Sequence, residues 1–75
     1  MSANVINVKK VSFIRFMYET RKLDPTVKEE LISFIRNNKD LIRGYKFGHI
    51  PGHRVYSVLL DDGESVDWRV SKRYF

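Results

Sequence analysis

Cysteine is absent from this 75-residue sequence, and it has only two prolines and four glycines. Without cysteine the chain has no disulfide framework, no thiol nucleophile and no thiolate zinc site, which fits a reducing cytosol. No glycine-serine, proline-rich or single-residue tract marks a linker or a low-complexity tail. We therefore expect residues 1–75 to form a single domain with a modest core.

Long hydrophobic runs are absent as well. The longest mainly apolar segment, residues 11–18, is interrupted by Arg15 and is far too short to cross a bilayer. Residues 1–10 lack the basic-then-apolar layout of a signal peptide. We expect a cytoplasmic protein that does not associate with a membrane.

Basic residues outnumber acidic ones, with 14 Lys and Arg against nine Asp and Glu, which gives a formal net charge of +5 at pH 7. This charge favours an anionic partner, with nucleic acid ahead of an acidic protein surface. The charge is patchy, because acidic residues gather in Asp61-Asp62-Gly63-Glu64.

Two helices are predicted in the first half of the chain. A strand over 11–22 would place Arg15 in the middle of an apolar face, whereas helical spacing puts Ser12, Arg15, Glu19 and Lys22 on one stripe, so a helix is favoured there. Asp24-Pro25 is a typical helix start, and the apolar spacing that follows predicts a second helix from Pro25 to about Arg36. Leu23-Asp24 would join the two helices into a hairpin.

The remaining segments predict strands. Val5, Ile6 and Val8 indicate a short first strand, while 41–47 fits either a strand or a last helical turn. Residues 54–60 and 65–70 are rich in β-formers and flank a turn in which Gly63 is free to adopt positive φ. The expected fold class is α+β, with a two-helix hairpin packed on a small antiparallel sheet.

Strand alternation assigns the faces of this sheet. Val66, Trp68 and Val70 fall on one face and Asp67 and Arg69 on the other. In the preceding strand, Arg54, Tyr56 and Val58 share a face. We expect Lys46, Arg54 and Arg69 to lie together on the open face, with the acidic turn pointing away from them.

Several side chains in the last third suit phosphate chemistry. Guanidinium groups fork onto phosphate oxygens and stabilise added negative charge, and histidine can carry protons near neutral pH. His49 and His53 lack the further ligands of a metal shell, so neither a metal nor a cofactor is expected. The candidate catalytic residues are Lys46, His53, Arg54, Arg73 and Tyr74. The candidate nucleic-acid-binding residues are Lys9, Lys10, Arg43, His49, Arg69 and Lys72.

Three segments carry a resemblance to a known family. They are Lys22-Leu23-Asp24-Pro25-Thr26-Val27 at the helix junction, Gly44-Tyr45-Lys46-Phe47 followed by Gly52-His53-Arg54-Val55-Tyr56-Ser57-Val58, and Val70-Ser71-Lys72-Arg73-Tyr74 at the end. Together with the order of the elements, they resemble the RelE/ParE toxin superfamily.

The resemblance implies a β-α-α-β-β-β fold and, as in ribosome-dependent members, metal-free cleavage of messenger RNA in a toxin-antitoxin pair. A partner antitoxin would mask the basic face. By position, Arg54 matches the arginine that stabilises the cleaved phosphate, Lys46 matches a basic residue of the preceding strand, and Arg73 or Tyr74 matches the terminal cluster. In that chemistry a 2′-hydroxyl attacks the neighbouring phosphate while a general acid protonates the leaving oxygen.

Two other functions remain open at this point. A small winged-helix DNA-binding regulator also combines helices with a basic hairpin, and residues 39–46 would be its short recognition helix. A strand at 41–47 that pairs with the hairpin favours the toxin-like fold, and a helix there favours the DNA binder. A non-catalytic protein-binding inhibitor module would use exposed aromatic and arginine side chains as anchors.

Overall fold

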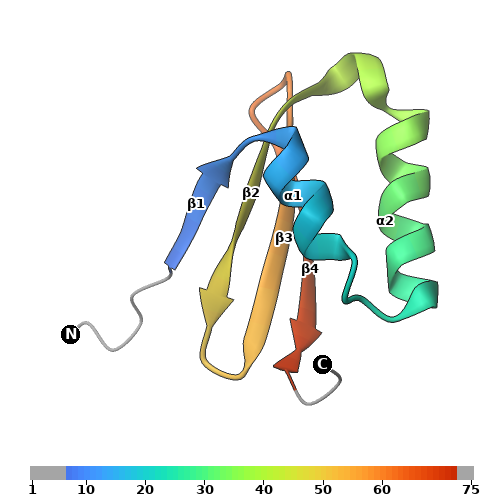
Figure 1. Ribbon diagram of the computed structural model, residues 1–75. Coiled ribbons are helices and arrows are strands. Elements are labelled where there is room, and N and C mark those ends of the chain that lie inside the picture. The colour runs from blue at the N-terminus through green and yellow to red at the C-terminus, as the bar shows by residue number, and fades with distance from the viewer. Residues whose placement is uncertain (1–6, 73–75) are drawn as a thin grey trace.

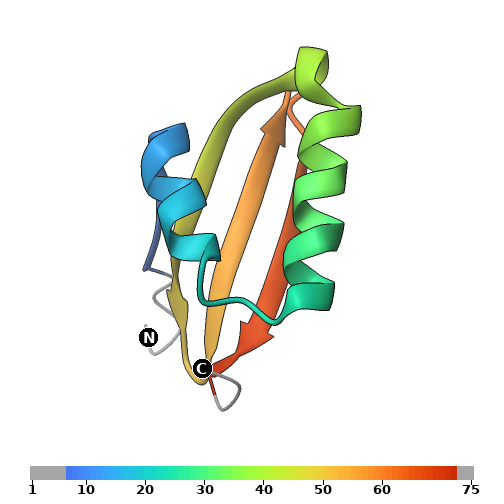
Figure 2. The same ribbon diagram turned by 45° about the vertical axis from the view of Figure 1, so that its right-hand side comes forward.

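The chain folds as one antiparallel sheet covered on one face by two helices (Figures 1 and 2). The computed structural model describes residues 7–72. The elements are β1 (Asn7–Val11), α1 (Phe13–Thr20), α2 (Pro25–Asn37), the single 3-10 turn η2 (Lys39–Leu41), β2 (Ile42–Ile50), β3 (His53–Leu60) and β4 (Ser65–Ser71). The strand order is β1-β2-β3-β4, and each neighbouring pair is antiparallel. The α+β prediction is confirmed.

Both helices begin at side-chain caps. The Ser12 hydroxyl accepts a hydrogen bond from the Arg15 N–H at 3.1 Å, so α1 starts at Phe13, and Val11 pairs with Tyr45 in the sheet instead. The predicted first helix, 11–22, was therefore too long at both ends. The second helix is confirmed, because the Asp24 carboxylate accepts from the Thr26 N–H at 3.0 Å with proline in the first turn.

The ambiguous segment 41–47 belongs mainly to β2, which runs along β3 from Ile42 to Ile50. The predicted first strand is present as β1, although Val5 and Ile6 lie outside the described residues. The hairpin between β3 and β4 is confirmed, with Gly63 at φ 89° in its turn. A second tight turn joins β2 and β3 through Gly52 at φ 78°.

The core lies between the helices and the inward face of the sheet. Phe16, Leu31, Tyr56 and Val58 are each 0% exposed. Phe16 of α1 packs against Tyr45 and Tyr56, and Phe34 of α2 packs edge-on against Trp68 of β4. The inward face of the sheet is called the helix face below, and the outward one the open face. No helix among residues 7–72 combines the length and the apolar character needed to cross a bilayer.

Candidate nucleic-acid interface

The strand register divides the predicted phosphate-binding residues between the two faces. Lys46 pairs with Ser57 and Arg54 pairs with His49, so Lys46 and Arg54 point to opposite sides. Lys46 and Arg69 line a hollow on the open face, whereas Arg54 forms an ion pair with Glu19 of α1. The prediction that Lys46, Arg54 and Arg69 share the open face is wrong. Arg54 alternates in phase with the buried Tyr56 and Val58, and therefore faces the helices.

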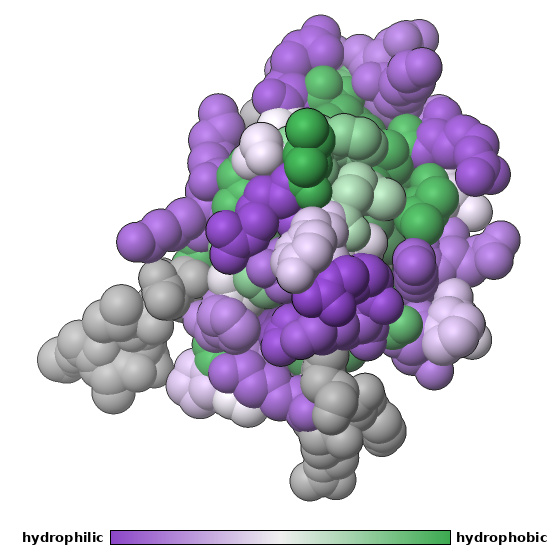
Figure 3. All heavy atoms as spheres, in the orientation of Figure 1, coloured by the Kyte–Doolittle hydropathy of each residue, from purple (hydrophilic) through white to green (hydrophobic). Residues whose placement is uncertain are grey.

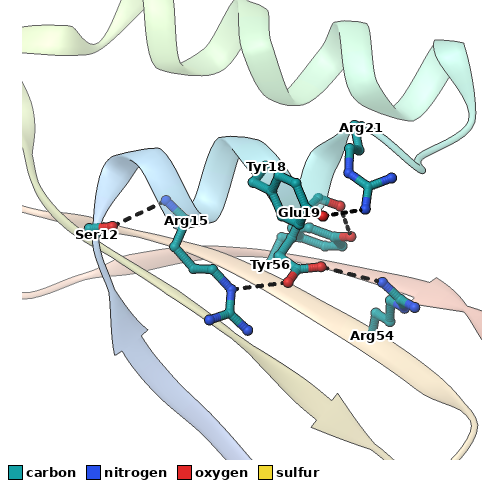
Figure 4. Close-up of polar contacts among 7 residues, drawn as sticks. All are labelled: Ser12, Arg15, Tyr18, Glu19, Arg21, Arg54 and Tyr56. Atoms are coloured by element: carbon teal, nitrogen blue, oxygen red, sulfur yellow. Dashed lines mark hydrogen bonds and ion pairs between the residues drawn. The ribbon is translucent and has the colours of Figure 1, made fainter.

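Four helix-face residues meet at Glu19, namely Arg15, Glu19, Arg54 and Tyr56 (Figure 4). His49 lies directly opposite Arg54 in the β2–β3 register and therefore on the same face, and the five residues are called the Glu19 cluster below. The Glu19 carboxylate accepts from Arg15 Nε at 3.0 Å through Oε2 and lies 3.7 Å from an Arg54 guanidinium nitrogen through Oε1. The side chains of Arg54 and Glu19 are only 19% and 16% exposed, so this ion pair is partly shielded from solvent.

Tyr56 fixes the backbone beneath this cluster. Its hydroxyl donates to the main-chain oxygen of Glu19 at 2.7 Å, at the end of α1 where helix carbonyls lack partners within the helix. Burial raises the pKa of Tyr56, and the neighbouring Arg54 partly opposes that change. The phenol therefore stays protonated near neutral pH, which suits a structural hydrogen-bond donor.

His49 adds a group that can exchange protons. Desolvation by burial lowers its pKa from 6.5, and the positive charges of Lys72 and Arg54 lower it further, while Glu19 opposes them. At neutral pH the imidazole is therefore mostly neutral and has a nitrogen lone pair available as a base. Lys72 follows the buried Val70 by two positions and continues the pairing with β3 through its bond to the Gly52 carbonyl, so alternation places it on the helix face.

A shallow hollow of about 300 Å³ lies beside the cluster, between α1 and the first two strands. Lys9, Arg15 and His49 contribute to its lining, together with Phe47 and Lys10. Lys9 pairs with Phe47 and so faces the helices, whereas Lys10 pairs with Lys46. The hollow and the Glu19 cluster together form a basic surface with an aromatic floor, which suits a phosphate chain carrying bases.

The other candidate residues are spread over the molecule. Lys10, which also borders the hollow, is in phase with Lys46 and Arg69 on the open face, and the His53 ring approaches the Pro51 carbonyl at 3.2 Å. Arg43 sits at an irregularity in the β2–β3 register and bonds to the Asp40 and Ile42 carbonyls, 3.9 Å from Asp61. This is the end of the sheet near the acidic turn, remote from His49. Arg73 and Tyr74 lie outside the described residues.

Sequence reasoning missed three members of the Glu19 cluster as site residues, namely Arg15, Glu19 and Tyr56. The i, i+4 spacing of Arg15 and Glu19 was visible as a polar stripe on α1. No local pattern indicated that Arg54, far along the chain, would contact the same carboxylate.

No group of three or more His, Asp or Glu side chains that could hold a metal ion occurs within the part of the chain that the structure describes. In comparisons with known proteins, no family model, no curated protein and no solved structure matches this chain.

Proposed function

We propose that this chain is a small toxin-like protein that binds RNA at the Glu19 cluster and cleaves it without a metal ion, acting on messenger RNA at the ribosome in the cytoplasm. The observation that carries the proposal is that Arg15 of α1 and Arg54 of β3 meet on one carboxylate, with His49 of β2 directly opposite Arg54 in the sheet. The β-α-α-β-β-β order supports a RelE/ParE-like assignment.

The cluster suits phosphate binding because its two guanidinium groups already share an anion. In the free protein, the Glu19 carboxylate forms ion pairs with both Arg15 and Arg54. A phosphate carries more charge-dense oxygens and can compete for the same donors in bidentate geometry. Lys9 of β1 and Lys72 after β4 add positive charge on either side of the cluster.

The same groups suit the chemistry of metal-free RNA cleavage. The neutral imidazole of His49 accepts the proton of a 2′-hydroxyl as its oxygen attacks the adjacent phosphorus. Arg54 stabilises the negative charge that builds on the non-bridging oxygens. The P–O5′ bond then breaks to leave a 2′,3′-cyclic phosphate, and the leaving oxygen takes a proton from an acid. Tyr74, one of the catalytic residues expected from the sequence, lies outside the described residues.

The extended state of residues 42–50 favours this proposal over the winged-helix DNA binder. Between α2 and β2 the described chain has only the 3-10 turn η2, whose three residues are too short for the recognition helix expected at 39–46. The winged-helix alternative therefore loses the recognition helix that was expected at residues 39–46.

A second candidate, the non-catalytic protein-binding module, is supported by the outer side of α1. Phe13, Ile14 and Tyr18 are 49%, 81% and 56% exposed. Figure 3 shows apolar surface among hydrophilic side chains on the side that carries the helices. Such a patch fits a protein partner, and an antitoxin would be one.

The test is cleavage of a labelled messenger RNA, alone and on ribosomes, in buffer containing a chelator. We expect products ending in a 2′,3′-cyclic phosphate, and at least about a hundredfold slower cleavage by His49→Gln and Arg54→Ala. Arg36→Ala, which removes an equal charge from the exposed surface of α2, should cleave like the parent. Intact RNA under all conditions, or equal cleavage by the Arg54 and Arg36 variants, would refute the proposal. Retained binding without cleavage would reduce it to RNA binding alone.

A further inference from the structure

The last strand of the sheet, β4, has a self-complementary sequence. Its seven residues are Ser65-Val66-Asp67-Trp68-Arg69-Val70-Ser71, which read the same in both directions except that Asp67 mirrors Arg69. The one position at which the two directions differ pairs an acidic residue with a basic one, Asp67 with Arg69. An antiparallel pair of two such strands, centred on Trp68, would therefore place serine opposite serine, valine opposite valine and aspartate opposite arginine.

This strand also lies at an edge of the sheet. β4 is last in the strand order and pairs only with β3 among the described residues. Its pairing with β3 is regular from Ser65 to Ser71, without a bulge or a proline to block a further strand. Ser65, Asp67 and Arg69 are exposed.

The hydrogen-bonding phase of β4 fits the same register. Leu60 N–H donates to the Glu64 carbonyl at 2.8 Å and Lys72 N–H donates to the Gly52 carbonyl at 3.0 Å. By alternation, Val66, Trp68 and Val70 bond to β3, and the N–H and C=O groups of Asp67 and Arg69 point to the free edge. In the register centred on Trp68, Asp67 and Arg69 of two copies form the hydrogen-bonded pairs.

The side chains agree with this arrangement. Within residues 7–72 the Arg69 side chain has no ion pair or hydrogen bond, while Asp67 accepts from Ser57 at 2.7 Å and, at 3.4 Å, from Ser65, both through Oδ1. Oδ2 of Asp67 therefore remains for a cross-strand guanidinium. Oppositely charged side chains directly opposite one another stabilise a strand pair, whereas like charges destabilise it.

The opposite edge of the sheet lacks this property. β1 carries Lys9 and Lys10, one on each face, so self-pairing would bring ammonium groups together on both sides. Lysines on an edge strand are a common protection against pairing. Of the two edges, only β4 is thus suited to a second copy.

We propose that two copies of this chain associate through β4 in antiparallel register about Trp68, forming a continuous eight-stranded sheet with twofold symmetry. In such an isologous contact, the free backbone N–H and C=O groups of both β4 strands find hydrogen-bond partners in each other. Because α2 lies on the β4 side of the helix layer (Figure 2), the same axis brings the α2 helices of the two copies toward one another. The inference does not depend on the proposed RNA chemistry.

The test is the oligomeric state of charge variants, measured by sedimentation over a concentration series. The parent should form a species of twice the 8.9 kDa chain mass. Asp67→Arg alone or Arg69→Asp alone places like charges opposite each other twice, so dimerisation should weaken by roughly tenfold or more. The double variant Asp67→Arg/Arg69→Asp restores both pairs and should dimerise like the parent.

Mixing the two single variants separates cross-strand pairing from local effects, such as loss of the Ser57 hydrogen bond. Each variant keeps its local change, but the cross-strand charges become complementary, so a heterodimer should form. Asp40→Arg and Lys39→Asp, equal charge changes on exposed η2, should dimerise like the parent. A monomeric parent up to about 1 mM, single variants that dimerise like the parent, or failure of both the double variant and the mixture would overturn the proposal.

Discussion

Replacing Tyr56 by phenylalanine tests whether the hydroxyl beneath the Glu19 cluster stabilises the fold. The ring is 0% exposed and packs against Phe16 and Phe47, so its apolar contacts survive the change. What is lost is the 2.7 Å bond to the Glu19 carbonyl, and that oxygen is left without its donor. Loss of one such bond with a buried acceptor left unsatisfied should reduce the free energy of unfolding by about 1–2 kcal/mol.

The measurement is urea unfolding followed by circular dichroism. With a slope of about 1 kcal/mol per molar urea for a domain of this size, the midpoint of Tyr56→Phe should fall by roughly 1–2 M at an unchanged slope. Tyr56→Ala, which also removes the ring from the core, should lose about 3–5 kcal/mol.

Tyr18→Phe is the matched control. The Tyr18 hydroxyl also takes part in a 2.7 Å hydrogen bond, with Arg21, but its side chain belongs to a residue that is 56% exposed. Water replaces that partner, so the cost should stay below about 0.5 kcal/mol. Equal midpoints for the Tyr56→Phe and Tyr18→Phe variants would show that the buried bond does not contribute as argued.

Two further predictions concern pH and a turn. The pKa of His49 is lowered from 6.5 in the folded protein, so the unfolded chain binds more protons as pH falls through 6.5. The stability contributed by the neutral imidazole is therefore present above that pH and is lost below it. Unfolding midpoints between pH 5 and 8 should show a shallower acid loss in His49→Gln, and an unchanged profile would contradict the assignment. RNA binding should instead strengthen below about pH 6.5, since protonated His49 adds a cation. Gly63→Ala should cost about 1–2 kcal/mol by thermal unfolding, because φ is 89° there, and a variant as stable as the parent would refute the strain.

The elements were predictable where local signals agreed. Asp24-Pro25 and the spacing of Val27, Leu31, Phe34 and Ile35 identified α2, and the acidic turn with Gly63 identified the last hairpin. The start of α1 was missed because Val11 is equally suited to strand and helix. Only its pairing with Tyr45, a partner far along the chain, decides the matter.

The candidate site was harder to predict because it depends on strand phase. Arg54 was identified as a candidate, and it was placed in phase with Tyr56, but the side of the sheet covered by helices was assigned wrongly. The sequence of a strand with basic and apolar residues does not show which face the helices cover. An arginine can lie on the helix-covered face when a carboxylate pairs with its charge. Glu19 supplies that carboxylate from α1, and its role follows only from the three-dimensional contact.

The position of β1 has a consequence for the order in which the molecule opens. Short turns connect β2, β3 and β4. In contrast, Lys9 of β1 pairs with Phe47 of β2, and both helices lie between these two strands in the sequence. The cost of closing that long loop is recovered only when β1 docks, so β1 should be the strand whose amides exchange with solvent first. Since Lys9 lines the hollow beside the Glu19 cluster, a bound polyanion should slow the exchange of β1 more than that of β3.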